Sequence, residues 1–257
     1  METIKELGNF KDILYIDEGH SYYADNRRLT SVTTLIGKFS QGFQASYWAN
    51  KKAKEYNVSA DSVLYAWQFL NDLSTFKGIA LHKYAENLWE GKVFKQDNSK
   101  ILENFGYNPL ESAIKKIKAQ YIDFYTDYKD ILVPLKAEMV VGDPELGVAG
   151  MFDRLFYDKI TSTIPLYDWK TEKEFNMNGE GYIKYMKKPL SHLQDNQFNQ
   201  HALQLSTYRY LLERRTGLQV GELVIGWFFE GNEKYKLIKL PYLKDEVEAM
   251  IGEYLIK

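Results

Sequence analysis

Three short apolar stretches between residues 137 and 171 decide the fold: AEMVV (137–141), GVAGMFDRLF (147–156) and LYDWKT (166–171). Each is rich in Val, Phe, Leu or Tyr, as β-strands are, and each has a length typical of a single β-strand. Each also carries an acid in apolar surroundings, namely Glu138, Asp153 and Asp168. The pattern predicts neighbouring strands that bring carboxylates together.

Asp168 and Lys170 are two residues apart in the third stretch. Side chains alternate between the two faces of a strand, so these two share a face and Trp169 points to the other. Carboxylates gathered at one sheet edge repel one another and are costly to desolvate, and a divalent cation removes that cost. The acid-x-lysine order therefore favours metal-dependent phosphodiester hydrolysis, although in isolation it also fits a surface ion pair between strands.

Composition limits the class of protein. The chain has 257 residues, a formal net charge of −2 and no cysteine. The lack of cysteine excludes disulfides, thiolate zinc sites and iron–sulfur clusters and is compatible with the cytoplasm. Residues 1–6 form no apolar signal core, and no run approaches about 18 apolar residues, so we expect a cytoplasmic protein without a membrane span. A net charge near zero still allows a local basic groove for nucleic acid.

The order of elements predicts one α/β domain with a central mixed sheet and helices on both faces. Residues 13–30 read as a β-hairpin, and residues 1–75 as an N-terminal extension packed on a core of residues 76–257. We expect helices at 31–37, 44–56, 60–75, 76–90, 110–130, 199–216 and 243–256, and further strands at 220–229 and 234–240. Residues 97–108 and 173–198 read as loops, the second as a substrate-facing lid with a basic patch that includes Lys187 and Lys188.

Two helices carry further candidate site residues. Gly78, His82 and Glu86 follow one another at four-residue intervals and lie on one helix face, and so do Gln204 and Tyr208. A lone histidine on a helix is more often structural than a ligand, but a glycine at this spacing permits close approach of another backbone or of a ligand. The hydroxyl groups of Ser31, Thr33 and Thr34 fit either a helix cap or a phosphate contact.

Together these motifs resemble the PD-(D/E)xK nuclease superfamily in its RecB-like branch. The match rests on order and setting, and its residues are His82 in Gly78-x3-His82-x3-Glu86, Glu138, Asp153 in Gly150-x2-Asp153, Asp168-x-Lys170 and Gln204-x3-Tyr208. The Ser31–Thr34 segment after a Tyr-rich hairpin and the run Asp168–Thr171 are similar to phage-type exonucleases and the mitochondrial genome maintenance exonuclease. Residues 92–130 carry little of the resemblance.

The resemblance implies a role for each residue. Asp153, Asp168 and the backbone carbonyl of Trp169 would hold Mg²⁺ or Mn²⁺, with His82 as a further ligand. Lys170 would position the attacking water or stabilise the transition state. The remaining residues would assist: Gln204 by orienting Lys170 or the phosphate, Tyr208 by contacting the phosphate or supporting the site, and Glu138 by binding a second metal or a water.

Two features depart from related enzymes. The iron–sulfur cluster of the CRISPR-associated and AddB-type nucleases is absent, because the chain has no cysteine. The literal Pro-Asp is also missing: Asp143-Pro144 reads as a turn, and residues 149–153 take the equivalent place.

The expected activity is therefore a Mg²⁺- or Mn²⁺-dependent DNA exonuclease acting on single strands or DNA ends in replication, recombination or repair. A phage-encoded enzyme of this kind would work in the host cytoplasm. The chain has no G-x4-G-K-[ST] motor motif, so it would act alone or with a helicase or recombinase partner. The alternatives are a structure-specific endonuclease and a non-catalytic DNA-binding recombination factor of the same fold.

Overall fold

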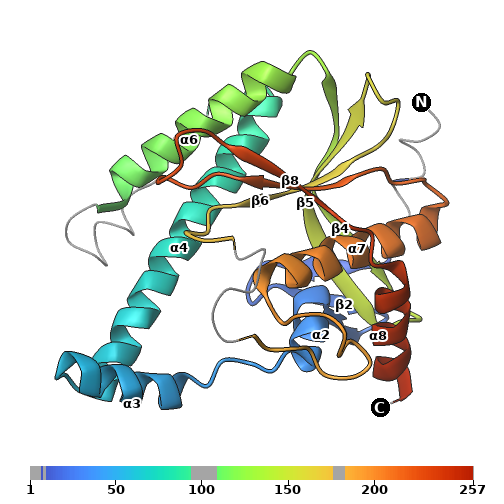
Figure 1. Cartoon of the computed structure of the whole chain (residues 1–257). Helices are drawn as coiled ribbons and strands as arrows, with labels where there is room; N and C mark the ends of the chain where they lie inside the picture. The colour runs from blue at the N-terminus through green and yellow to red at the C-terminus, as the bar shows by residue number, and fades with distance from the viewer. Residues whose placement is uncertain (1–6, 8–9, 94–108, 176–182, 257) are drawn as a thin grey trace.

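A computed structural model describes residues 7, 10–93, 109–175 and 183–256. Among these residues eight strands form one mixed sheet with helices on both faces (Figure 1). The strands are β1 Leu14–Ile16, β2 Ser21–Ala24, β3 Arg27–Ser31, β4 Leu132–Asp143, β5 Val148–Asp158, β6 Leu166–Lys170, β7 Leu223–Trp227 and β8 Lys236–Leu240. The mixed α/β architecture predicted from the sequence is confirmed.

The long strand β5 organises the sheet. β4 pairs with it antiparallel along its length, from Asp143↔Val148 to Leu132↔Asp158. β3 pairs with the beginning of β5 in parallel, at Val148 and Ala149, and β6 pairs antiparallel nearer its end, at Arg154 and Leu155. Asp153 therefore lies where β5 changes partners. It immediately precedes Arg154, the first residue of β5 that pairs with β6.

Helices α4 (Ala60–Trp89) and α6 (Pro109–Tyr128) cover one face of the sheet. Leu81 and Ala85 of α4 and Tyr121 of α6 pack with Tyr167 and Trp169 of β6 in one buried cluster. The rings of Tyr121 and Trp169 meet edge to face, with centroids 5.4 Å apart. This aromatic core holds the back of β6, so that Asp168 and Lys170 face the opposite side of the strand, as the alternation predicted.

Helices α2 (Val32–Phe39), α7 (Gln197–Thr216) and α8 (Lys244–Ile256) cover the other face. Leu203, Leu205 and Leu211 of α7 are fully buried in the largest cluster, together with Phe152 and Leu155 of β5. Asn196 caps α7, since its side chain accepts a hydrogen bond from the Asn199 backbone, and Gly217 ends the helix in the left-handed conformation.

The first half of α4 and helix α3 (Ala45–Tyr56) form an arm that extends away from the sheet in Figure 1. The two helices pack through a small cluster of Ala49, Ala53 and Val63. α4 has 30 residues, which corresponds to about 45 Å at 1.5 Å per residue. One helix thus connects the arm to the centre of the sheet.

The prediction of separate helices at 60–75 and 76–90 is wrong, because α4 is continuous. Nothing in the sequence ends the helix near residue 75: the Thr75 hydroxyl donates to the Asn71 carbonyl within it, and a single Gly78 costs only about 1 kcal/mol relative to Ala. The division proposed at residue 75 falls inside this helix. In addition, β3 joins the central sheet, so the N-terminal residues and the core share elements.

Other boundaries differ by a few residues. α2 ends at Phe39 instead of Gly37, and the Ser40 backbone N–H closes its last turn on the Ile36 carbonyl. The predicted loop at 97–108 lies outside the described residues. No helix among the described residues is both long and apolar enough to cross a membrane.

Candidate metal centre

His82, Glu138 and Asp153 bring one ligand atom each to within 4.8 Å of the others. His82 Nδ1 is 3.4 Å from Asp153 Oδ1 and 3.5 Å from Glu138 Oε1. The residues come from α4, β4 and β5, so the cluster joins the helical layer to the sheet. Imidazole nitrogen and carboxylate oxygen are ligands that divalent transition metals accept together.

Glu138 is held in an unusual backbone conformation. Its φ of +43° lies in the left-handed region, which non-glycine residues seldom adopt within a strand. The strand register continues from Ala137↔Arg154 to Met139↔Phe152, and Glu138 lies between them across from Asp153. The conformation costs of order 1–3 kcal/mol, and such strain concentrates at functional sites.

Asp153 ties the cluster to β6. Its Oδ2 accepts a hydrogen bond from the Trp169 backbone N–H at 2.6 Å. His82 Nε2 is 3.2 Å from the Trp169 carbonyl oxygen. The side chains of His82 and Asp153 therefore flank the two peptide groups of Trp169, and the carbonyl that the resemblance implies as a ligand lies beside the cluster.

Asp168 and Lys170 lie on the same face of β6. Lys170 Nζ is 2.5 Å from Asp168 Oδ2, and the Asp168 side chain is 3% exposed. The surface ion pair considered for this acid-x-lysine triplet is thus excluded, because the acid is buried. A buried pair of this kind is weak evidence for stability and fits better with a functional role.

Two residues of the cluster and the neighbouring Lys170 have shifted pKa values. Burial, reinforced by the charge of Asp168, raises the pKa of Asp153 to about 7. Burial alone would lower the pKa of His82, but the charge of Asp153 and the hydrogen bond with Glu138 outweigh it and raise the pKa to about 9. Burial also opposes the charge of Lys170, and the charges of Asp168 and Asp153 again prevail and raise its pKa.

These shifts test whether a divalent cation fits. In the metal-free protein the His82 imidazolium and the Lys170 ammonium offset the carboxylates of Glu138, Asp153 and Asp168. A cation at the cluster would take over the charge of the imidazolium and leave the imidazole free to coordinate. The donor set, mostly hard oxygen with one nitrogen, fits Mn²⁺ and Mg²⁺ and contains no thiolate.

Gln204 and Tyr208 lie against the same region from α7. The Gln204 amide donates to the Tyr208 hydroxyl at 2.9 Å. The Tyr208 ring is buried directly over Gly150: a Cβ at Gly150 would lie 2.5 Å from its Cε1 atom. Burial raises the Tyr208 pKa, so the hydroxyl stays neutral and acts as a hydrogen-bonding group. The glycine before Asp153 is thus required for this ring to reach the sheet.

The hydroxyl segment caps a helix. Ser31 Oγ accepts from the Thr34 backbone N–H at 3.1 Å and is 2.7 Å from the Thr34 hydroxyl. Thr33 is exposed and lines a hollow of about 230 Å³ together with Gln204. The capping interpretation of Ser31 is confirmed, and the phosphate contacts of Thr33 and Thr34 stay predictions.

Part of the predicted lid is anchored. The Lys187 backbone N–H donates to the Phe39 carbonyl at 2.7 Å, and Asp195 accepts from the Ser40 hydroxyl at 2.8 Å. Met186 and Leu190 are buried in the main core, while Lys187 and Lys188 are exposed. Residues 176–182 of the predicted loop lie outside the described residues. The described part is a fixed wall beside α2, and its lysines stay predicted substrate contacts.

A cavity of about 640 Å³ adjoins the cluster, and His82 and Glu138 both line it. Its other walls come from the β1–β2 turn, α4 and β5, through Tyr15, Asp17, His20, Gly78, Ile79, Lys83, Glu86 and Met151. The volume is in the usual range of about 300–1,000 Å³ for small-molecule sites. The sequence indicated Gly78 and Glu86 by their spacing from His82, but not the hairpin residues, which reach the site only through the folding of β1 and β2.

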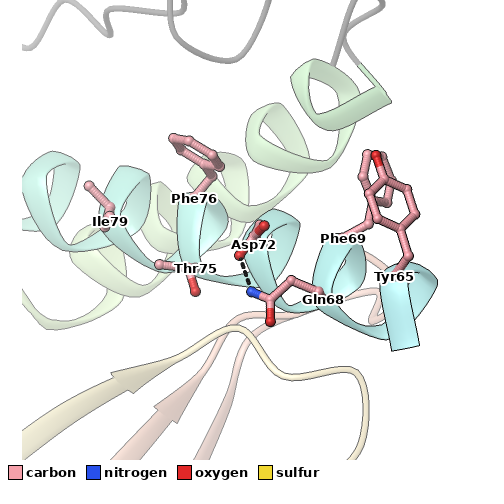
Figure 2. A pocket seen from close by; sticks show the side chains of 7 residues that line it. All are labelled: Tyr65, Gln68, Phe69, Asp72, Thr75, Phe76 and Ile79. Carbon is pink, nitrogen blue, oxygen red and sulfur yellow. Dashed lines mark hydrogen bonds between the residues drawn. The ribbon is translucent and has the colours of Figure 1, made fainter. Parts of the chain in front are cut away.

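A second hollow, of about 500 Å³, continues along the same face of α4. Figure 2 shows its lining, from Tyr65 to Ile79, with the Gln68 amide donating to Asp72. Ile79 lines both hollows, so they meet on the helix. Aromatic residues, among them Tyr65, Phe69 and Phe76, are prominent along this second part.

His201 and Glu172 were missed by the sequence analysis. His201 Nε2 is 3.1 Å from Glu172 Oε1, and the imidazole stacks on Phe175 with centroids 5.4 Å apart. Their spacing from predicted site residues could have indicated both: Glu172 is two residues past Lys170, and His201 is three residues before Gln204 on α7. The pair joins the end of β6 to α7 beside the candidate site.

No protein-family model matches the chain, and no curated protein matches it either. Among solved structures, one described as "Crystal structure of SSO0001" is 12% identical and has a TM-score of 0.29. The match covers 69% of this chain and 84% of the other. This likeness is too weak to support an argument about function.

Proposed function

We propose that this protein is a Mg²⁺- or Mn²⁺-dependent deoxyribonuclease with a PD-(D/E)xK core, and that it acts as an exonuclease on single strands or DNA ends. The observation that carries the proposal is the convergence of His82, Glu138 and Asp153, with buried Asp168 beside Lys170. The residues come from four separate elements, so their meeting is independent of the sequence spacing that suggested them.

His82, Asp153, Asp168 and the Trp169 carbonyl would hold the cation, and Glu138 would hold a second cation or a water. When bound, a divalent cation polarises the scissile phosphate and acidifies water, which turns it into a nucleophile at neutral pH. Asp153 accepts the Trp169 N–H and so fixes the orientation of the peptide that follows β6 residue Asp168. The strained backbone at Glu138 places its carboxylate near His82 before any ligand arrives.

Lys170 provides the positive charge that hydrolysis requires beside the phosphate. Its pKa is raised, so its ammonium remains charged at neutral pH, and an ammonium group can donate up to three hydrogen bonds. It would orient the water for attack on phosphorus and offset the charge that develops on the leaving sugar oxygen as its bond to phosphorus breaks. Gln204, held by Tyr208, would orient Lys170 or a phosphate oxygen.

The preference for single strands is supported by the two hollows along α4. Tyr65 and Phe69 line the hollow that adjoins the cavity beside His82. Aromatic side chains stack with bases of any sequence, at about 1–3 kcal/mol per base. A single strand with unpaired bases can use such a surface, whereas a duplex cannot.

Digestion of a labelled linear single strand in Mg²⁺, Mn²⁺ or EDTA tests the proposal. Wild-type protein should cut only with metal, and Lys170→Ala should lose cutting by at least a hundredfold at a temperature where circular dichroism shows that it is folded. Lys173→Ala is the matched control, because Lys173 is exposed and its ammonium lies 3.9 Å from the equally exposed Glu174. Equal cutting by Lys170→Ala and wild type, or cutting in EDTA, would refute the assignment.

A further inference from the structure

The cavity beside the cluster has a wall built by the N-terminal hairpin. The Tyr15 hydroxyl lies 2.6 Å from His20 Nδ1 and 3.1 Å from Asp17 Oδ1, so three residues of the β1–β2 turn region are joined by hydrogen bonds. The Tyr15 ring also packs on the Tyr22 ring, with centroids 5.3 Å apart. These contacts within the hairpin support the wall without a ligand, as a preformed binding site requires.

The surfaces of the cavity suit a nucleoside. Tyr15 and His20 provide rings on the hairpin side, and Met151 provides a thioether from β5. Rings and methionine sulfur both pack favourably against flat aromatic groups. On the helix side Gly78 leaves the wall open, since a Cβ built on it would meet no atom within 4 Å. The space between these walls is continuous with the metal cluster through His82 and Glu138.

The charges in the cavity disfavour a second phosphate. Outside the cluster, the acids Asp17 and Glu86 line the cavity together with Lys83 and the imidazole of His20. Within the cluster, Glu138 and the proposed metal ligand His82 line the same space, so three carboxylates accompany one lysine. Carboxylates repel a phosphate and accept hydrogen bonds from hydroxyl groups. The charge of the wall thus complements a neutral nucleoside that ends in a free hydroxyl.

We propose that this cavity binds the terminal nucleoside of the strand, with its end hydroxyl free, and that Asp17 and Glu86 discriminate against a terminal phosphate. The inference rests on the proposed nuclease function and specifies its substrate: the scissile phosphate lies at the cluster and the last nucleoside lies in the cavity. Tyr15 and His20 are then binding residues for the terminal base. The enzyme would release the terminal nucleoside together with the scissile phosphate, as a mononucleotide, so that the shortened strand again ends in a free hydroxyl, and it would need an end to begin.

Four single strands of one sequence test the inference, with hydroxyl or phosphate at the 5′ end or at the 3′ end and the opposite end blocked by a non-nucleotide spacer. At one end, the hydroxyl strand should be cut about tenfold faster than the phosphate strand, the order of magnitude for like charges close together. Equal rates at both ends, or a preference for phosphate, would refute the subsite and leave the nuclease assignment standing. If none of the four strands is cut with either metal, the proposed function fails and the inference fails with it.

Charge-removing variants locate the discrimination. Asp17→Asn and Glu86→Gln should each reduce the preference for hydroxyl ends at least threefold, because each removes one repelling charge. Glu18→Gln and Glu90→Gln are matched controls, since they remove neighbouring acids that do not line the cavity. A preference that is unchanged in both cavity variants, or equally reduced in the controls, would overturn the assignment to Asp17 and Glu86.

A steric block tests the cavity itself. Gly78→Leu places a side chain into open space in a helix interior, so it should keep or raise thermal stability while lowering kcat/KM on hydroxyl-ended strands at least tenfold. Gly252→Leu on α8 is the matched control, because Gly252 also has no atom within 4 Å of an added Cβ and is remote from the cavity. Full activity in folded Gly78→Leu would show that no nucleoside enters this space.

Discussion

Replacing Gly150 by alanine should damage both stability and the site. A Cβ at Gly150 would lie 2.5 Å from Tyr208 Cε1, 3.3 Å from Tyr208 Cζ and 3.2 Å from Val32 Cγ2. Carbon atoms in ordinary contact are about 3.5–4.0 Å apart, so the ring must move by roughly 1 Å. Tyr208 is 3% exposed and Val32 is fully buried, so neither side chain can turn toward solvent.

Overpacking of this kind costs about 1–3 kcal/mol. At about 2–4 °C per kcal/mol for a chain of this size, Tm should fall by roughly 2–12 °C. Activity should fall more than stability does, because the displaced ring carries the hydroxyl that accepts from Gln204. Differential scanning fluorimetry and urea titration in EDTA measure the first effect, and the rate of single-strand cleavage at a temperature where the variant is folded measures the second.

Gly78→Ala should change the free energy of unfolding in the opposite direction. Gly78 is in the interior of α4 with open space around an added Cβ, so alanine should stabilise the protein by about 0.5–1 kcal/mol. If Gly150→Ala were as stable as wild type, or if Gly78→Ala lowered Tm, the packing described around Tyr208 and along α4 would be wrong.

The remaining predictions concern the metal centre. At pH 7.5 a group with a pKa of about 9 is roughly 97% protonated, so Mn²⁺ binding should release about one proton from His82, measured as the slope of calorimetric enthalpy against buffer ionisation enthalpy. The slope should fall in His82→Gln and stay unchanged in His192→Gln, and a zero slope in wild type would exclude His82 as a ligand. In EDTA, protonation of His82 should stabilise the fold fully below pH 6.5, and this stabilisation should disappear as pH rises through about 9. If the Tm of His82→Gln depended on pH in the same way as the Tm of wild type, this prediction would be wrong. Mn²⁺ at about 100 times the Kd of each protein should stabilise wild type and Lys170→Ala by about 2.7 kcal/mol, and the same concentration as for wild type should not stabilise Asp153→Asn. An equal Tm shift in Asp153→Asn would show that Asp153 is not a ligand.

The sequence was sufficient to predict the strand-borne part of the site. Period-two alternation placed Asp168 and Lys170 on one face of β6 and Trp169 on the other, and the buried cluster around Trp169 confirms it. The helix carrying Gln204 and Tyr208 was predicted from residue 199 but begins at Gln197, because Asn196 was not identified as its N-cap, while its end before Gly217 was predicted correctly. These features depend only on local rules.

Other features depend on contacts between distant segments, which local rules do not contain. The left-handed φ of Glu138 lies where the β4–β5 pairs pass from Ala137↔Arg154 to Met139↔Phe152, and no residue type in AEMVV indicates it. Likewise, the hairpin wall of Tyr15 and His20 exists only because β3 pairs with β5 and brings the N-terminal residues to the cluster. The continuity of α4 shows the converse error, in which one helix was divided at residue 75 although no residue there ends it.

The most direct test of the central claim compares a linear, end-labelled single strand with a covalently closed single-stranded circle of the same length, each incubated with Mn²⁺ and either wild type or Lys170→Ala. The account predicts that wild type degrades the linear strand and leaves the circle intact, that Lys170→Ala degrades neither, and that EDTA abolishes the activity. Cutting of the circle would make the protein an endonuclease, and persistence of the linear strand with every metal would contradict the catalytic roles assigned to His82, Asp153, Asp168 and Lys170.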